Sequence, residues 1–187
     1  MGLIINRKAT KKFKVISCKK EPVIQFISSD KKIRENLYEE FKRDNIILPE
    51  YSRFKRSFFN KKDLVVLKED FDIAFKYNEK AYHFVAKKGF CYDATSIPLI
   101  ISYGRLSKIN QYNLIGATFH DAAFALKLFS RVDSDNIFDG LLKFKKMFFI
   151  TRWFHLLGLR LFGWLVYNKK EDKPWCEGFV ELDIIGY

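Results

Sequence analysis

Short apolar runs separated by polar breaks dominate the first half of the chain and predict β-strands. Residues 13–17 and 23–27 alternate or run apolar on either side of a Lys-Lys-Glu-Pro break. Residues 64–67 and 71–75 continue the pattern, and an Asn-Glu-Lys turn leads to residues 81–86 as the returning strand of a hairpin. These runs predict a small antiparallel sheet.

Apolar residues at helical spacing predict one helix in the first third of the chain and a largely helical second half. A Ser-Asp pair at residues 29–30 offers a cap, after which Ile33, Leu37 and Phe41 share one face. Residues 111–129 are apolar nearly all round, which is typical of a buried helix.

A further helix is predicted to begin with Ser134 or Asp135 as its N-cap. Gly158 and Gly163 weaken the apolar helical run that ends at Tyr167, which predicts a kink or a break in it. The fold class expected from both halves is α+β, a small antiparallel sheet followed by packed helices. The capped helix should carry four apolar residues on one face: Ile137, Leu141, Phe144 and Phe148.

The apolar run at residues 147–167 is about as long as a bilayer span. It also contains Arg152, His155 and Arg160, and a charged residue at mid-bilayer costs roughly 2.5–3.5 kcal/mol. We therefore expect a core helix with no transmembrane span, and a helix lying in a membrane interface is the alternative. Arg152 or His155 is expected to bond carbonyl or carboxylate groups in the core.

Composition supports a folded core, and charge divides the chain in two. Of the 187 residues, 48% are apolar and 20 are Phe, which is ample for a core. Residues 1–62 hold 17 Lys and Arg against 7 Asp and Glu, a net of +10, whereas residues 63–187 hold 17 against 15, a net of +2. We interpret residues 1–62 as a basic N-terminal extension or subdomain and residues 63–187 as the α+β core domain.

The three cysteines indicate a reducing compartment. Cys18, Cys91 and Cys176 are odd in number, far apart in sequence, and form no C-x-x-C pair. A disulfide framework or a thiol-based zinc site is therefore not expected. The N-terminal apolar run is too short for a signal peptide, so a cytoplasmic location is predicted.

Two adjacent polar residues, His120 and Asp121, interrupt the apolar helix and need partners if they are buried. Asp93, after the hairpin, and Asp135, in the next helix, are acids that can supply them. Histidine with carboxylates suits a hard divalent cation or a general acid–base pair. Structural roles are the alternatives: an Asx turn at Asp93 bonded by Ser96, an N-cap at Asp135, and a satisfied core histidine.

The same residues carry a family resemblance. The stretch at residues 71–98 is extended, contains Gly-Phe and ends in Asp-Ala-Thr-Ser-Ile-Pro. With the later histidine, aspartates and Phe138, it resembles the domain of unknown function 1353 family, which is common in phages and prophages. The resemblance covers about residues 64–167 and implies a site, although the reaction of the family is unsettled. The positions that match are Asp93, Ser96, Ile97, Pro98, His120, Asp121, Asp135 and Phe138, together with Gly163.

The chain departs from the family pattern at three positions. Thr95 replaces a smaller residue, and Ser134 stands in place of Ala. Phe124 stands where the family tends to have Tyr, which removes a hydroxyl that could donate a proton.

Three functional interpretations follow. The first is a metal-dependent hydrolase-like centre with Asp93, Ser96, His120 and Asp121 as catalytic residues, and with Asp135 joining Asp93, His120 and Asp121 as ligands of a divalent metal ion. The second is a non-enzymatic phage structural or host-interaction module in which these residues lock a turn against a helix. The third is nucleic-acid or anionic-surface binding through residues 1–62.

Any binding to a polyanion is expected to belong to residues 1–62, where aromatic residues at 51–62 interleave with cations and can stack on bases. Affinity should fall steeply with salt, because phosphate contacts release counterions. Titration of DNA and RNA at low and moderate salt, with the full chain and with a chain that begins near Asp63, tests this. Equal binding by the shortened chain, or no binding by either, would contradict it.

Overall fold

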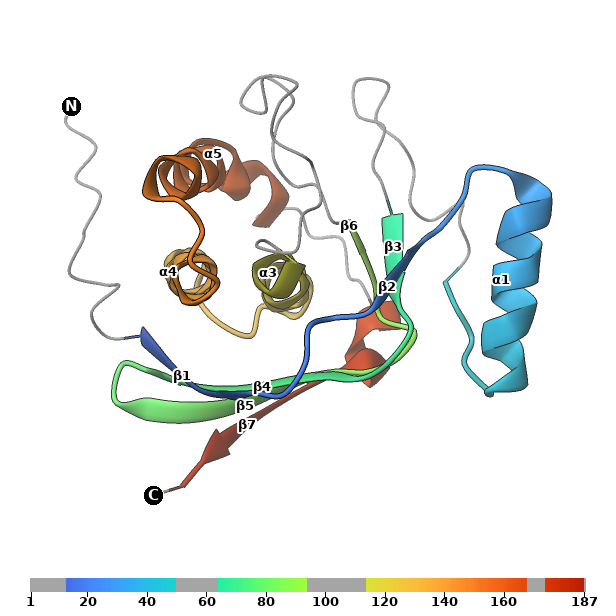
Figure 1. Cartoon of the computed structure of the whole chain (residues 1–187), viewed down its shortest axis with the longest axis horizontal. Helices are drawn as coiled ribbons and strands as arrows, with labels where there is room; N and C mark the ends of the chain where they lie inside the picture. The colour runs from blue at the N-terminus through green and yellow to red at the C-terminus, as the bar shows by residue number, and fades with distance from the viewer. Residues whose placement is uncertain (1–12, 50–63, 94–113, 168–173, 187) are drawn as a thin grey trace.

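The computed structural model describes residues 13–49, 64–93, 114–167 and 174–186, and the following account concerns these residues. They form layers: a four-stranded antiparallel sheet, helices α3 and α4 on one face of it, and α5 beyond them (Figure 1). A smaller sheet with α1 on its outer side stands at one end. The α+β fold class predicted from the sequence is confirmed.

The described elements, in chain order, are β1 (Phe13–Cys18), β2 (Ile24–Phe26), α1 (Lys31–Arg43), β3 (Leu64–Leu67), β4 (Phe71–Tyr77), β5 (Lys80–Ala86), β6 (Cys91–Asp93), α3 (Leu114–Leu126), α4 (Arg131–Phe144), α5 (Phe149–Tyr167), a 3₁₀ helix η3 (Pro174–Phe179) and β7 (Val180–Ile185).

The main sheet has the strand order β1-β4-β5-β7 and is antiparallel throughout. Its centre is the predicted hairpin of β4 and β5, whose two turn residues Asn78 and Glu79 both have positive φ, 49° and 69°. A two-residue turn of that kind matches the twist of the paired strands. The C-terminal β7 completes the sheet against β5, so strands from both ends of the chain flank one hairpin.

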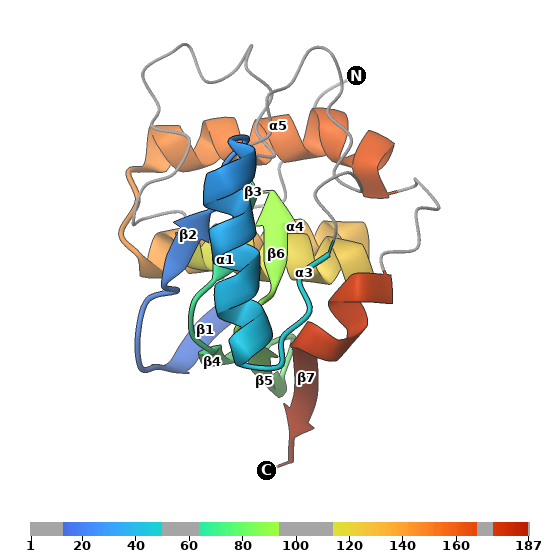
Figure 2. The same ribbon diagram turned by 90° about the vertical axis from the view of Figure 1, so that its right-hand side faces the viewer.

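The second sheet has the order β2-β3-β6, and α1 covers it (Figure 2). Asp30 caps α1, as predicted, because its side chain accepts a hydrogen bond from the backbone N–H of Ile33 at 3.0 Å. Leu37 and Phe41 of the helix pack with Leu64 and other residues of the sheet in a separate apolar cluster. Ile33, which the sequence placed on the same face, is exposed.

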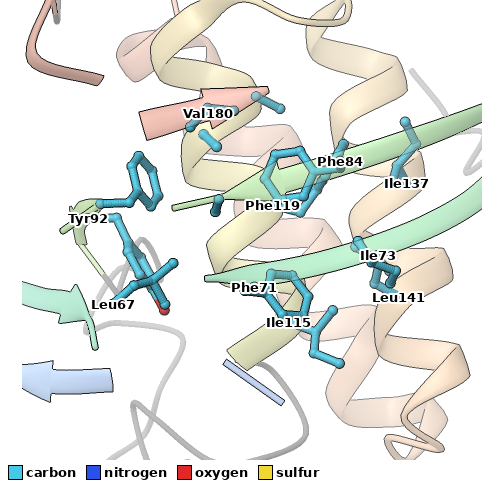
Figure 3. Packing of buried hydrophobic residues seen from close by; sticks show 14 of the residues in the cluster. Leu67, Phe71, Ile73, Phe84, Tyr92, Ile115, Phe119, Ile137, Leu141 and Val180 are labelled. Atoms are coloured by element: carbon cyan, nitrogen blue, oxygen red, sulfur yellow. The ribbon is translucent and has the colours of Figure 1, made fainter. Parts of the chain in front are cut away.

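The largest core lies between the main sheet and helices α3 and α4, where Figure 3 shows ten of its residues labelled. Phe119 of α3 is its centre. The Phe119 ring meets Phe75 and Phe84 edge-on, with ring centroids 5.5 and 5.1 Å apart, and lies 5.9 Å from Phe129. Such contacts add to the burial of apolar area and fix which side of α3 faces the sheet.

The structure corrects the helix boundaries expected from the sequence. Helix α3 ends at Leu126 because Lys127 takes the left-handed conformation, with φ of 51°. Helix α4 is capped by Ser130, whose hydroxyl accepts from the N–H of Asp133. The prediction that Ser134 or Asp135 is the cap is therefore wrong, since both lie inside α4 and are buried.

Two further predictions are corrected, and two strands are found that were not predicted. Phe144 and Phe148 do not share the buried face of Ile137 and Leu141 but are exposed, because α4 ends at Phe144 and the chain turns before α5. The apolar run up to Tyr167 is one helix, so the predicted break at its glycines is wrong, whereas the alternative of a kink stays a prediction. Strands β6 and β7 were not expected. Among the described residues, no helix is long and apolar enough to cross a bilayer.

The division of the chain at residue 62 stays a prediction. Strands β1 and β2, from before it, pair with β4 and β3, from after it. Residues 13–49 hold 8 Lys and Arg against 6 Asp and Glu, so +8 of the +10 belongs to residues 1–12 and 50–62, outside the described residues. A chain that begins near Asp63 lacks both strands, so neutralising the cations of those two segments is the gentler form of the polyanion test.

Replacing the core ring with Phe119→Ala should lower the free energy of unfolding by about 3–5 kcal/mol, because it removes buried area and leaves a cavity. The matched control is Phe149→Ala in α5, where the ring is 66% exposed and the loss should stay within about 0.5 kcal/mol. Urea unfolding followed by circular dichroism measures both. Equal losses in the two variants would contradict the placement of Phe119.

Candidate functional site

The rotation of α3 brings His120 to the helix layer. Phe119 faces the sheet, and the next residue projects about 100° further round the helix, towards α4. The His120 side chain is buried, with its ring between two phenylalanines: the ring centroids lie 4.0 Å from Phe124 and 5.2 Å from Phe138. This aromatic packing limits the ways in which the imidazole can turn.

Carboxylates stand at both nitrogens of the His120 ring. Nε2 lies 3.1 Å from Oδ1 of Asp135, at hydrogen-bond distance, and Nδ1 lies 3.8 Å from Oδ1 of Asp121. Burial by itself would lower the pKa of His120, but the interactions with Asp121 and Asp135 outweigh it and raise the pKa. The three side chains differ in exposure: Asp135 is fully buried, His120 is nearly so, and 15% of the Asp121 side chain is exposed.

Asp135 also faces α5. Nε of Arg160 lies 3.7 Å from Oδ2 of Asp135, and the same guanidinium donates to Oδ1 of Asn136 at 2.8 Å. Nδ2 of Asn136 lies 3.4 Å from the hydroxyl of Tyr77, which donates to Asp133 at 2.6 Å. The buried carboxylate is thus linked through α5 and α4 to the end of the central hairpin.

A second ion pair joins α4 and α5 one turn further along. Arg152 donates to both carboxylate oxygens of Asp139 at 2.9 Å, a bidentate geometry. Burial raises the pKa of Asp139, and the charge of Arg152 opposes that rise. His155 bonds the carbonyl of Thr151 through Nδ1 at 2.7 Å, and burial lowers the pKa of its imidazole. The expectation that Arg152 or His155 bonds core carbonyls or carboxylates is confirmed for both.

Strand β6 lies against α3 on the other side of the candidate site. The hydroxyl of Tyr92 shares a 2.8 Å hydrogen bond with Thr118, which also bonds the carbonyl of Leu114. Burial raises the pKa of the Tyr92 hydroxyl, and the negative charge of Asp121 adds to this rise. Asp93 is the next residue, and its backbone pairs with Leu64.

The structure therefore brings together three of the residues singled out from the sequence: His120, Asp121 and Asp135. Ser96 and the side chain of Asp93 lie outside the described residues, so their convergence with the others stays a prediction. Within the described part of the chain, no group of three or more His, Cys, Asp and Glu side chains is placed to hold a metal ion.

Sequence reasoning missed two members of the polar network, Asp139 and the role of Arg160 as a partner of Asp135. The sequence did contain a pattern that indicates these contacts. Asp135 and Asp139 stand four apart in an apolar helix, and the next apolar helix carries two arginines, Arg152 and Arg160. Residues four apart share a helix face, so acids on one face opposite arginines on the next helix indicate paired helices.

The comparisons with known proteins identify a family. The model of the family described as "Protein of unknown function (DUF1353)" matches residues 67–159, the segment that contains the main hairpin, α3, α4 and part of α5. No curated protein and no solved structure matches the chain.

His120 should make the stability depend on pH in a defined direction. Because its pKa is raised by folding, its contribution is fully present below the unfolded value of about 6.5 and is lost as pH rises through the folded value. The natural protein should therefore be more stable than His120→Gln by a larger margin at pH 6 than at pH 9. Both proteins are measured in the presence of a metal chelator, so that metal binding does not contribute to the difference.

His155→Gln is the matched control with the opposite sign. Folding lowers the pKa of His155, so the natural protein should lose stability relative to this variant as the pH falls below about 6.5. Urea titrations at several pH values measure both differences. If the stability margin of the natural protein over His120→Gln grew as the pH rose, the conclusion that folding raises the pKa of His120 would be wrong.

Proposed function

This chain belongs to the DUF1353 family, and we propose that its function is that of a divalent-metal-dependent hydrolase-like centre built around His120 and Asp121. The description of the family assigns no activity, so the proposal is supported by geometry and chemistry alone. In this proposal, Nδ1 of His120 and the carboxylate of Asp121 would bind the metal ion. Asp135 would orient the imidazole through its contact with Nε2, the nitrogen that does not bind the metal.

The observation that carries the proposal is the order of carboxylate, imidazole and carboxylate. Asp135 is fully buried and bonds Nε2 of His120, which leaves Nδ1 towards Asp121, the most exposed of the three side chains. Metal-binding histidines commonly donate their second nitrogen to a carboxylate, which fixes the tautomer and makes the ligating nitrogen more basic. We therefore assign Asp135 a positioning role in place of the direct ligation expected from the sequence.

Charge supports the same proposal. Two carboxylates face one imidazole, and their negative charge favours a positive charge at His120, which is why the pKa of the imidazole is raised. A cation at Nδ1 would take the place of a proton there, so binding should release protons and weaken as pH falls. Asp93 and Ser96 are proposed to complete the ligand set and the catalytic group, since β6 lies against α3. When bound, the cation would lower the pKa of a coordinated water to make a nucleophile.

A second candidate is the structural lock, in a non-enzymatic phage structural or host-interaction module. It is favoured by the partners that Asp135 already has, because His120 and Arg160 both face its carboxylate. The pair of Asp139 and Arg152 uses both carboxylate oxygens of Asp139 and ties the same two helices. In this case the polar network specifies helix packing and needs no cation.

Three further points stay proposals, whichever of the two candidate functions is correct. They are a phage or prophage origin, a cytoplasmic location, and nucleic-acid or anionic-surface binding by residues 1–62. The cations that would support the last of these lie mainly in residues 1–12 and 50–62.

Thermal melts with Mg²⁺, Mn²⁺ and Zn²⁺ at pH 8 separate the two main candidates. A metal ion held by the folded protein at a hundred times its Kd should stabilise it by about 2.7 kcal/mol. The shift should saturate, diminish at pH 6, and disappear in Asp121→Asn. The control Asp133→Asn, on α4 and bonded to Tyr77, should keep the metal-induced shift.

Elemental analysis of the purified protein and turnover of chromogenic phosphate and carboxylate esters with each metal complete the test. Saturable metal binding without ester hydrolysis would support a metal site and contradict the hydrolase activity. Melts that no metal moves, with Asp121→Asn behaving like the natural protein, would overturn the metal centre in favour of the structural lock.

A further inference from the structure

Helix α5 carries apolar residues on a buried side and also on an exposed side. Its inner side, with His155, Gly158 and Leu159, is buried against the rest of the helix layer. Five exposed apolar residues of the helix lie on its outer side, within roughly 140° of arc at 100° per residue. The same arc also contains the half-buried Leu157 and Arg160. The exposed residues of this outer face, which begins just before the helix, are Phe148, Phe149, Ile150, Trp153, Phe154 and Leu161.

The outer face is aromatic at one end. The rings of Phe148 and Phe149 lie 4.9 Å apart, and those of Trp153 and Phe154 lie 5.2 Å apart. A group of exposed aromatic side chains of this kind marks a site of association. In Figure 2, α5 runs along one side of the molecule, beyond α4 and away from the main sheet. Association there would leave the sheet and its core unchanged.

Charge around the outer face points to an anionic occupant. Residues 140–170 contain seven Lys and Arg and no Asp or Glu. Two of the seven, Arg152 and Arg160, already face Asp139 and Asp135 of α4. Lys143 and Lys146, at the junction of α4 and α5, are exposed, whereas Lys145 pairs with Glu21. A Trp- and Phe-rich helix face beside lysines is the arrangement by which helices lie in the interface of anionic membranes.

Other occupants fit less well. A second copy docked face to face would bring the two cationic stretches together, and like charges across an interface disfavour association. The segments of this chain outside the described residues, at 1–12, 50–63, 94–113 and 168–173, each have a net positive charge and offer no complement. We propose that the outer face of α5 binds the surface of an anionic lipid bilayer, with the helix parallel to the membrane plane.

Flotation of the full chain with vesicles tests this proposal. Vesicles of phosphatidylcholine with phosphatidylglycerol should carry the protein at low salt, and vesicles of phosphatidylcholine alone should carry much less. The double variant Phe149→Ser/Trp153→Ser should lose binding to the anionic vesicles. In Lys143→Gln/Lys146→Gln, each charge removed should weaken binding roughly fivefold. The matched control is Ile184→Ser, an equally exposed apolar position on β7 that should leave binding unchanged.

Tryptophan fluorescence gives an independent readout. Brominated lipids in the anionic vesicles should quench the natural protein, and Trp153→Phe should remove much of that quenching while keeping the vesicles bound. Circular dichroism confirms that each variant is folded.

Three results would overturn the proposal. One is the absence of flotation with anionic vesicles at low salt. Another is binding that survives Phe149→Ser/Trp153→Ser, which would assign it to the basic segments of residues 1–62. The last is polyglutamate binding as tight as vesicle binding and dependent on the same residues, which would indicate an acidic protein partner.

Discussion

The carboxylate of Asp135 has no access to solvent at the place where helices α3, α4 and α5 meet, and such a charge is tolerated only with close partners. His120 of α3 and Arg160 of α5 supply them. One buried charge thereby sets the relative rotation of three helices. Phe119 makes this possible, because its contacts with the sheet turn His120 towards α4.

The two ion pairs between α4 and α5 differ in geometry. Arg152 binds Asp139 with two short hydrogen bonds, so this pair is geometrically complete. Arg160 approaches Asp135 only to 3.7 Å and gives its shorter bond to Asn136, so the Asp135 carboxylate relies on His120. The contact between α4 and α5 therefore depends more on the Asp139 pair than on the Asp135 pair.

Helix α5 takes part both in the proposed site around His120 and in the proposed membrane-binding surface. Arg152 and Arg160 of this helix meet Asp139 and Asp135 of α4, and its exposed aromatic residues lie towards its N-terminal end. A helix apolar on both sides is normally buried. Among the described elements, α5 has its main contacts with α4. We propose that its exposed apolar side receives a partner and that the nearby cations favour an anionic one.

The sequence by itself determined the fold class, the main hairpin, the cap of α1 and the need of His120 for partners, because these follow from local periodicity and from the cost of burying polar groups. It misplaced the start of α4 and the faces of Phe144 and Phe148, since a serine four residues upstream caps equally well and a helix end is set by the turn that follows. Only the tertiary structure decided that β7 pairs with β5, and that Arg160 joins His120 at Asp135. Contacts between residues far apart in the chain leave no periodic trace, because their partners are chosen by packing and charge in three dimensions.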